Sequence, residues 1–428
     1  MNHNPLYVGI DLGTSGCRVM AINRELQPVA DGKAPLATPR RDGHICEQDA
    51  ETWWSAVCNA VEDLTGHIDP GSIQAIAVDG TSGSIVLTDD QGTPVSPGLL
   101  YNDARALDEA DRIAQVAPET SGAHGASSGL AKLLFLQTHS DNRYARHVLN
   151  QAEWVAARLC GVYGIGDENN CLKLGYDILN RKWPAWLDML KIKREWLPRV
   201  VTPGTPLGTV DKSNAQRFGL APHCRVVAGT TDSIAGFLAT GANRVGEAVT
   251  SLGSTLAIKI LSRQPVFAPD SGIYSHRLGE WWLTGGASNS GGAVLRHFFD
   301  QTQLDELTAQ LEPDHPTGLD YYPLLVPGER FPVCDPEFAP RLTPHPAQPS
   351  QFFQGMLEGI ARIEADAYRR LADLGAPYPL SIRTVGGGAV NSAWTRIRAH
   401  ELNVPLIAPK YTEAAYGAAL LAAGDYPL

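Results

Sequence analysis

The feature that most constrains the fold is a short pattern that occurs twice in the chain. Residues Tyr7 to Asn23 contain two apolar runs on either side of the polar turn DLGTSG. Residues Val249 to Ile260 repeat the order of apolar run, glycine-bearing turn and apolar run, with LGST as the turn. Short apolar runs joined by glycine and small polar residues are typical of β-hairpins. Because an internal repeat indicates a repeated structural unit, the sequence predicts two similar domains with one such hairpin each.

The first turn has the composition of an anion-binding loop. Gly13 and Gly16 permit backbone angles that present N–H groups to an anion, and Thr14 and Ser15 add hydroxyl donors. Asp11 places a carboxylate where Mg²⁺ would take an oxygen ligand. Neither of the patterns GxxxxGK[ST] and GxGxxG occurs here. An ordinary hairpin turn explains this stretch alone equally well, and the second copy favours a phosphate-binding loop.

Composition and charge restrict the class of protein. A chain of 428 residues with 43% hydrophobic and 19% charged residues is typical of a soluble globular protein with two domains. The formal net charge of −11 argues against a nucleic-acid partner. The seven cysteines form no CxxC pair, so neither a zinc site nor a disulfide framework is indicated. With no signal segment and no apolar run of membrane-spanning length, we expect a cytoplasmic protein without a membrane partner.

Two further stretches carry specific patterns. In RVVAGTTDSIAGFL, Val226 to Ala228 is predicted to form a short strand and residues 229–231 a turn. Asp232 then falls at the start of a helix, where an aspartate commonly acts as the N-cap. Near the C-terminus, the strand Ile382 to Val385 leads into three consecutive glycines and a helix from about Ser392. Three glycines allow the backbone to approach a flat ring closely.

In their order along the chain, these motifs resemble those of the FGGY carbohydrate kinases, members of the actin-like, ribonuclease-H-like ATPase superfamily. The resemblance extends from Tyr7 to Ala423. It implies an α/β fold with two actin-like domains around an interdomain cleft. Residues 1–241 would form the N-terminal domain with the sugar site and the catalytic base, and residues 242–428 the C-terminal, nucleotide-binding domain.

The resemblance also implies roles for individual residues. Asp232 would be the general base, which takes the proton of a sugar hydroxyl while that oxygen attacks the γ-phosphorus of ATP. Asp11 would hold Mg²⁺. Contacts to ATP would come from both hairpin turns and from the glycine loop with its following helix: Gly13, Thr14, Ser15, Gly253, Ser254, Thr255, Gly386, Gly387, Gly388, Asn391 and Trp394.

Sugar contacts are expected from Ser82, Asp103, Asp232 and Ser233. Ser82 stands at roughly the position where the family often has histidine, and it would give a smaller site. Asp103 lies in LLYNDAR, an altered form of the family's Trp-x-Asp-x-Arg. A loop ion pair between Asp103 and Arg105 explains that spacing equally well.

The closest likeness is to the compact D-ribulose kinases of the family, some of them labelled xylulose kinase, and it rests on stretches such as DGTSG, AGTTDSIA and VTSLGST. The resemblance therefore implies ATP-dependent phosphorylation of D-ribulose to D-ribulose 5-phosphate, with D-xylulose as the alternative substrate. A non-catalytic actin-like ATPase and a sugar sensor are the alternatives from other classes. The expected partners are the sugar and ATP. A homodimer is considered, although the sequence does not define the oligomeric state.

Overall fold

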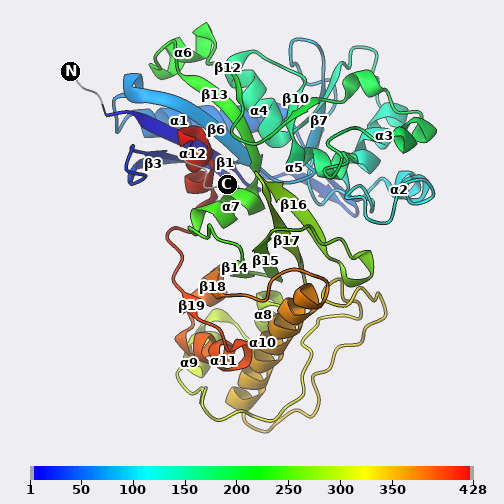
Figure 1. The fold of residues 1–428 in the computed structure, drawn as a ribbon, viewed down its shortest axis with the longest axis vertical. Helices are drawn as coiled ribbons and strands as arrows, with labels where there is room; N and C mark the ends of the chain where they lie inside the picture. The colour runs from blue at the N-terminus through cyan, green and yellow to red at the C-terminus, as the bar shows by residue number, and fades with distance from the viewer. Residues whose placement is uncertain (1–3, 425–428) are drawn as a thin grey trace. The chain divides into compact units, whose positions relative to one another are not determined.

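The computed structural model describes residues 4–424 and divides the chain into two compact units (Figure 1). The first unit runs to Ala239 and takes up the chain again at Glu413, and the second runs from Thr240 to Thr412. The change at Ala239 lies close to the boundary expected at residue 241. The last helix, α12 (Ala414–Ala423), belongs to the first unit, in contrast to the expected C-terminal domain 242–428.

The first unit is built on a mixed six-stranded sheet. The hairpin predicted from residues 7–23 is confirmed, because its two strands pair in antiparallel register from Tyr7–Ile22 to Leu12–Cys17. The first strand also pairs in parallel with the strand that ends in the DG of DGTSG. The strand order is β12 (Pro206–Thr209), β13 (Arg225–Thr231), β6 (Ile73–Gly80), β1 (Leu6–Leu12), β2 (Gly16–Ile22) and β3 (Pro28–Pro35).

Smaller sheets and seven numbered helices complete the chain up to residue 239. The second sheet has the order β4 (Arg40–Asp42), β5 (Ile45–Gln48), β8 (Gly98–Leu99), β7 (Ile85–Thr88) and β9 (His147–Asn150), and a further pair joins β10 (Ile165–Asp167) to β11 (Arg199–Val201). The helices are α1 (Ala50–Thr65), α2 (Leu107–Ala114), α3 (Gly129–His139), α4 (Gln151–Cys160), α5 (Glu168–Cys171), α6 (Lys212–Phe218) and α7 (Asp232–Ala239).

Side-chain size decides what covers each face of β1. Val8 and Ile10 are buried in one core cluster with Trp53 of α1 and Trp154 of α4. Gly9 points the other way, where a Cβ atom would lie 1.9 Å from the carbonyl oxygen of Ala415 in α12. Because Gly9 has no side chain, α12 packs directly on β1 (Figure 1).

A second close approach at a glycine joins α12 to α7. A Cβ atom on Gly417 would lie 1.9 Å from the carbonyl oxygen of Ala235, so only glycine permits this approach. Small residues on α12 therefore hold α7 beside β1. This packing places the start of α7 near the end of β1, where Asp232 and Asp11 lie.

The second unit repeats the plan with a second mixed sheet. The predicted second hairpin is confirmed by antiparallel pairing from Ala248–Ile260 to Leu252–Leu256. The strand order is β16 (Tyr274–Leu278), β17 (Trp281–Ala287), β15 (Leu256–Ser262), β14 (Glu247–Leu252), β18 (Ser381–Val385) and β19 (Leu406–Ile407). The helices are α8 (Gly292–Phe298), α9 (Gln301–Thr308), α10 (Pro349–Asp373) and α11 (Ser392–Leu402).

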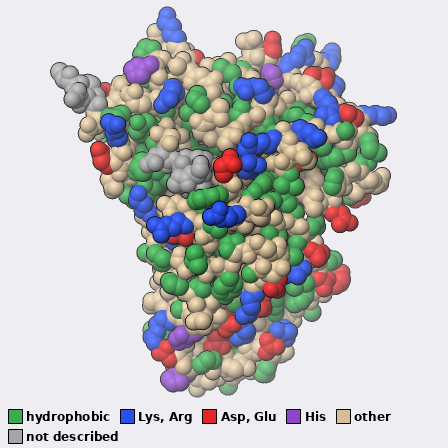
Figure 2. All heavy atoms as spheres, viewed as in Figure 1, with side chains coloured by type: hydrophobic (Ala, Val, Ile, Leu, Met, Phe, Trp, Pro, Cys, Tyr) green, Lys and Arg blue, Asp and Glu red, His purple; other side chains and the backbone are tan. Residues whose placement is uncertain are grey.

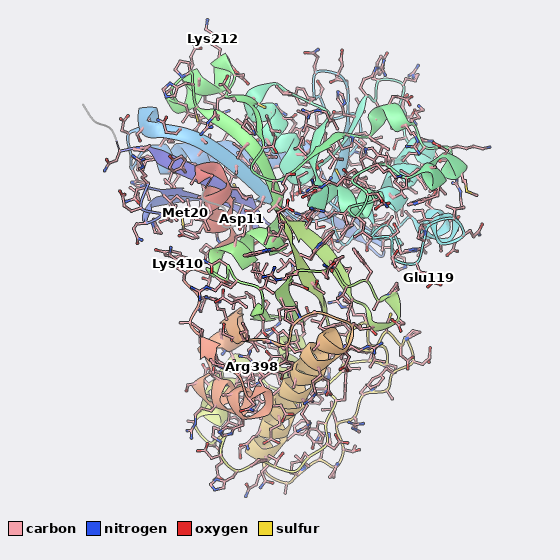
Figure 3. The ribbon with its side chains drawn as sticks, viewed as in Figure 1. Asp11, Met20, Glu119, Lys212, Arg398 and Lys410 are labelled. Carbon is pink, nitrogen blue, oxygen red and sulfur yellow. The ribbon has the colours of Figure 1, made fainter. Side chains whose placement is uncertain are left out.

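A buried ion pair fixes α11 against α10. The guanidinium of Arg398, labelled in Figure 3, donates to the Glu364 carboxylate with N–O distances of 2.6 and 2.7 Å. Both side chains are fully buried. The hydroxyl of Thr250 on β14 donates to the same carboxylate at 2.5 Å. This network links both helices to the strand that leads into the LGST turn.

None of the helices within residues 4–424 is long and apolar enough to cross a membrane. On the face drawn in Figure 2, basic and acidic side chains are intermixed.

Candidate active site

The first phosphate turn consists of the three residues between β1 and β2. The backbone N–H of Gly13 donates to the carbonyl oxygen of Gly16 at 3.1 Å and closes the turn, which leaves Thr14 and Ser15 exposed. Neither glycine has a positive φ angle, so the expected reason for glycine at these positions is wrong. At Gly16 the reason is space, because a Cβ atom there would lie 2.8 Å from the carbonyl oxygen of Ala34 on β3.

Three carboxyl groups lie at the ends of adjacent parallel strands. In the registers of the sheet, Asp11 on β1 pairs with Asp79 on β6, and Asp79 pairs with Thr230 on β13. Asp232 follows β13 directly as the first residue of α7. The sheet therefore brings together the predicted Asp11 and Asp232 and adds Asp79, whose side chain the sequence analysis did not assign to the site.

Asp79 is fully buried and has an unusual environment. Neither of its carboxylate oxygens accepts a hydrogen bond from a donor group in the described part of the chain. Burial raises the pKa of Asp79 well above its usual range, and the charges of Asp11 and Asp232 raise it further. Of the three neighbouring carboxyl groups, Asp79 is therefore the one whose neutral form is most strongly favoured.

Of the two neighbouring carboxyl groups, Asp11 ionises more readily than Asp79. Burial, followed by the charge of Asp232, raises the pKa of Asp11 to about 6, while the hydrogen bond with Asp79 acts in the opposite direction. Figure 3 labels Asp11 in the first unit. An ionised, partly buried carboxylate beside the phosphate turn is a suitable oxygen ligand for Mg²⁺. Within residues 4–424 no three His, Cys, Asp or Glu side chains converge as a metal site. A Mg²⁺ ion held by Asp11 would therefore complete its coordination with phosphate oxygens and water, as this ion commonly does.

The segment before Asp232 differs from the prediction. Residues 229–231 do not form a turn but continue β13 across an irregularity in its pairing with β6. A Cβ atom on Gly229 would lie 1.6 Å from the carbonyl oxygen of Val78, so glycine is required for the two strands to pair here. Asp232 is half-buried, its Oδ1 accepts the backbone N–H of Ser233 at 2.6 Å, and Ser233 is exposed. The carboxylate thus serves the helix start and is also accessible.

On the sugar side, two buried oxygens have no hydrogen-bond partner among the described residues. They are Oγ of Ser82, in the turn after β6, and Oδ1 of Asn102, in the segment after β8. Buried polar atoms normally have a partner, so an unpartnered one in a native structure needs an explanation such as a ligand or an ordered water. Ser82 is a predicted sugar contact, whereas Asn102 lies in the LLYNDAR motif and has no predicted role.

Both carboxylate oxygens of Asp103 form hydrogen bonds within the protein. Its side chain is fully buried, and Oδ2 accepts the backbone N–H of Cys46 at 2.7 Å. Both oxygens also accept from the guanidinium of Arg105, at 2.7–3.0 Å. Arg105 in turn pairs with Glu47 at 2.7 Å. This arrangement corresponds to the loop ion pair, the alternative to the predicted sugar contact, and it engages both carboxylate oxygens of Asp103.

The second unit contains a pocket of about 480 Å³ beside the LGST turn. Its wall includes residues predicted to bind ATP and others that were not: Leu252, Gly253, Ser254, Gly292, Leu295, Arg296, Gln301, Leu304, Asp305, Thr308, Phe353, Leu357, Gly387, Gly388, Val390, Asn391 and Trp394. The predicted Thr255 and Gly386 do not line it. The volume lies within the range of small-molecule and cofactor sites.

Each glycine of the triplet has a separate role. Gly386 has φ 87° and a Cβ atom there would lie 2.7 Å from the carbonyl oxygen of Leu252. A Cβ atom on Gly388 would lie 2.5 Å from the ring of Trp394. A Cβ atom on Gly387 would have no other atom within 4 Å, and this glycine lines the pocket. Two glycines therefore shape the loop, and Gly387 offers a bare backbone to a ligand.

The polar atoms of Asn391 and Trp394 are engaged within the protein. Asn391 Oδ1 accepts the backbone N–H of Trp394 at 2.9 Å and caps α11, while its Nδ2 donates to Thr308 at 3.0 Å. The indole N–H of Trp394 donates to the Leu357 carbonyl oxygen at 3.2 Å. Both residues line the pocket, so they can contact a ligand by their surfaces while they hold the loop and helix in place.

Comparison with known proteins agrees with this arrangement. Residues 6–239 match the model described as "FGGY family of carbohydrate kinases, N-terminal domain", and residues 248–425 match the model of the C-terminal domain. The chain is 26% identical to a xylulose kinase of Escherichia coli strain K12, over 92% of this chain and 84% of that protein. It is 25% identical to an autoinducer-2 kinase of Escherichia coli O9:H4, over 97% and 85% of the two proteins.

Solved structures of known kinases have the same fold. A xyloylose kinase from Brucella ovis superposes with a TM-score of 0.89 at 25% identity, over 97% of this chain and 90% of that chain. A gluconate kinase from Lactobacillus acidophilus has the same fold, with a TM-score of 0.86 at 20% identity over 97% and 88% of the two chains. The family matches extend over both units and include the two hairpins, Asp232 and the glycine loop. The chain therefore belongs to the FGGY family of carbohydrate kinases, enzymes that phosphorylate sugars with ATP.

Proposed function

We propose that this kinase transfers the γ-phosphate of ATP to the C5 hydroxyl of a ketopentose, with D-ribulose as the preferred substrate. The observation that carries the proposal is the pair of buried, unpartnered oxygens, Ser82 Oγ and Asn102 Oδ1. Both lie in segments that the family resemblance assigns to sugar binding. A ligand with several adjacent hydroxyl groups can donate to both oxygens, which would remove the cost of leaving them buried without partners.

Asp232 is the proposed general base. Its carboxylate is accessible at the start of α7, and it needs only to accept the proton of the attacking hydroxyl. The C5 hydroxyl of a ketopentose is primary and unhindered, so it can meet this carboxylate while other hydroxyls bind elsewhere. Phosphoryl transfer depends mainly on such alignment and on charge stabilisation. The exposed Ser233 is proposed to add a hydroxyl contact to the sugar.

The phosphate charge is the other requirement of the reaction. We propose that Asp11 holds Mg²⁺, which would neutralise charge on the phosphate oxygens when bound. Gly13, Thr14 and Ser15 would add backbone and hydroxyl donors. Asp79, the register partner of Asp11 in the parallel pairing of β1 and β6, lies beside this carboxylate.

D-xylulose is the second candidate substrate. It is favoured by the relatives, among them the Escherichia coli xylulose kinase at 26% identity. D-ribulose is favoured by the closer likeness of the DGTSG and AGTTDSIA stretches to the compact kinases and by the small Ser82. The two sugars differ only in configuration at C3, so a site that hydrogen-bonds one epimer leaves polar groups unpaired with the other.

We predict that kcat/KM for D-ribulose exceeds that for D-xylulose by roughly tenfold or more, because one unpaired buried group costs about 1–3 kcal/mol. The measurement is ADP formation by the full chain with D-ribulose, D-xylulose, L-ribulose, glycerol and gluconate. Equal rates, or a preference for D-xylulose, would contradict D-ribulose as the preferred substrate. The assignment as a sugar kinase would still hold. Absence of any sugar-dependent ADP formation across the panel would contradict the proposed class of substrate.

We further propose that Arg296 contacts the phosphates of ATP. It lies in the wall of the pocket, and its Nη2 donates to Ser254 Oγ in the LGST turn at 2.9 Å. Among the described residues no carboxylate forms an ion pair with its guanidinium, so its charge is not neutralised by the protein. An arginine in this state is well suited to an anionic ligand.

Arg296→Ala is expected to raise KM for ATP about tenfold, because an exposed charge-assisted hydrogen bond contributes about 1.4 kcal/mol. KM for the sugar should stay within about twofold, since none of the residues proposed to contact the sugar lines this pocket. Steady-state kinetics with each substrate varied in turn separates the two constants. Arg341→Ala is the matched control, because Arg341 is a half-exposed arginine of the same unit that pairs with Asp320 outside the pocket. An unchanged KM for ATP in Arg296→Ala would contradict the assignment.

A further inference from the structure

Lys132 is a lysine with no exposure to solvent. It lies in the first half of α3, and its exposed fraction is 0%. Its Nζ donates to the carbonyl oxygen of Gly83 at 2.8 Å and to that of Leu100 at 2.6 Å. Lysine is almost never fully buried unless its charge is paired. Here the two hydrogen-bond acceptors are neutral backbone groups, so burial of this side chain needs a specific reason.

The surroundings of Lys132 disfavour its charge. Burial and the neighbouring charge of Lys173 lower the pKa of Lys132 to about 7, and the carboxylate of Asp103 opposes the shift. An apolar side chain of similar size would fill the same space without this desolvation. The hydrogen bonds that Lys132 makes are therefore the property that an apolar residue cannot supply.

The two carbonyl groups belong to separate segments that both carry unpartnered oxygens. Gly83 follows Ser82, whose Oγ is buried without a partner, and Leu100 precedes Asn102, whose Oδ1 is in the same state. Lys173 adds to the first contact, because its Nζ donates to the carbonyl oxygen of Ser82 at 3.1 Å. The antiparallel pairing of Ile85 with Leu99 already brings the two segments side by side. Lys132 adds a second link at the ends that carry Ser82 and Asn102, because one atom binds a carbonyl oxygen of each segment. The relative position of Ser82 and Asn102 therefore depends in part on this lysine.

We infer that Lys132 is a positioning residue for sugar selection, which holds the Ser82 turn and the Asn102 segment at the separation needed to bind adjacent hydroxyls of one sugar. The inference rests on the proposed sugar site and adds to it the group that sets its geometry. Both hydrogen bonds of Lys132 go to backbone carbonyl groups of these segments, so we infer that it acts through the two segments and not on a reacting atom. Its loss should weaken binding of the sugar and reduce discrimination between epimers, with the nucleotide site unaffected.

The test is a double-mutant cycle on the full chain with Lys132→Met and Ser82→Ala. Methionine keeps the length and apolar stem of lysine but donates no hydrogen bond. Lys132→Met is expected to raise KM for D-ribulose about tenfold. KM for ATP should stay within about twofold, and the preference for D-ribulose over D-xylulose should shrink toward unity. Because Lys132 acts on the sugar partly through Ser82, the double variant should lose less than the product of the two single losses. Lys212→Met is the matched control, since Lys212 is an exposed lysine of the same unit, labelled in Figure 3.

A merely structural lysine would give a different result. It would lower the active fraction, and hence kcat, with the KM for sugar and the epimer preference unchanged and with multiplicative losses in the cycle. That result would overturn the inference. If Lys132→Met does not fold, Lys132→Gln is used, because glutamine is too short to reach both carbonyls and should show the same rise in KM. Failure of both variants to fold would assign Lys132 to the core and also overturn the inference. A parent enzyme without sugar-dependent ADP formation would instead contradict the proposed function.

Discussion

Asp232→Ala is expected to lower the rate of sugar phosphorylation by roughly 10²–10⁴, the usual contribution of a positioned general base. ATP binding should remain nearly intact, because the pocket proposed to bind the nucleotide is lined by residues of the second unit and does not include Asp232. The measurement combines kcat from sugar-dependent ADP formation with ATP affinity from calorimetry. A loss in kcat with unchanged ATP affinity would identify a residue needed for the chemical step.

A helix-start role must be separated from a catalytic one, because Asp232 also accepts the N–H of Ser233. Asp211 provides the matched control: it caps α6 in the same unit by accepting the N–H groups of Ser213 and Asn214 at 2.7 and 2.9 Å. Asp211→Ala should cost about 1 kcal/mol of stability and leave kcat unchanged. Retained turnover in Asp232→Ala would reduce Asp232 to the same structural role.

Asp11→Ala is expected to lower turnover by roughly 10²-fold or more, the scale of removing one charge-stabilising contact from a transition state. It should also raise the Mg²⁺ concentration needed for half-maximal activity, because the phosphate charge would lose its placed counter-ion. The measurement is a Mg²⁺ titration of kcat at saturating ATP and sugar. Asp42→Ala, which removes an exposed carboxylate of the same unit, should titrate as the parent does.

Two outcomes would contradict the role of Asp11. If the Mg²⁺ dependence of Asp11→Ala equals that of the parent, Asp11 does not bind the metal. A variant that fails to fold would instead point to the Asp11–Asp79 pair as a structural contact, and Asp11→Asn then tests the metal role with the shape of the side chain retained. Thermal unfolding followed by circular dichroism distinguishes the two cases.

The sequence alone determined the elements whose signals are local. Both hairpins are encoded by apolar runs around glycine-bearing turns, and their strands pair as predicted. The glycine triplet and the helix after it were placed correctly, since glycine and an Asn cap act within a few residues. Asp232 at the start of a helix follows from the same kind of short-range pattern.

Other features were decided only by tertiary structure, because they depend on residues far apart in the chain. Asp79 becomes part of the carboxyl cluster through the parallel register of β1 and β6, which no local pattern encodes. Asp103 is occupied by Cys46 and Arg105, so an apparent ligand became an internal ion pair. The burial of Lys132 has no local signal in the sequence, because it arises only when α3 packs this side chain against the carbonyl groups of Gly83 and Leu100.

The position of α12 shows the same limit at the level of domains. Its sequence is rich in small residues. Gly9 and Gly417 decide where the helix packs, because a side chain at either position would collide with the backbone of a distant element. The helix therefore completes the first unit although it ends the chain. Local sequence determines which residues are available for the chemistry. The packing of distant segments determines which of these residues lie close together, because a side chain becomes buried and finds its hydrogen-bond partners only when those segments pack.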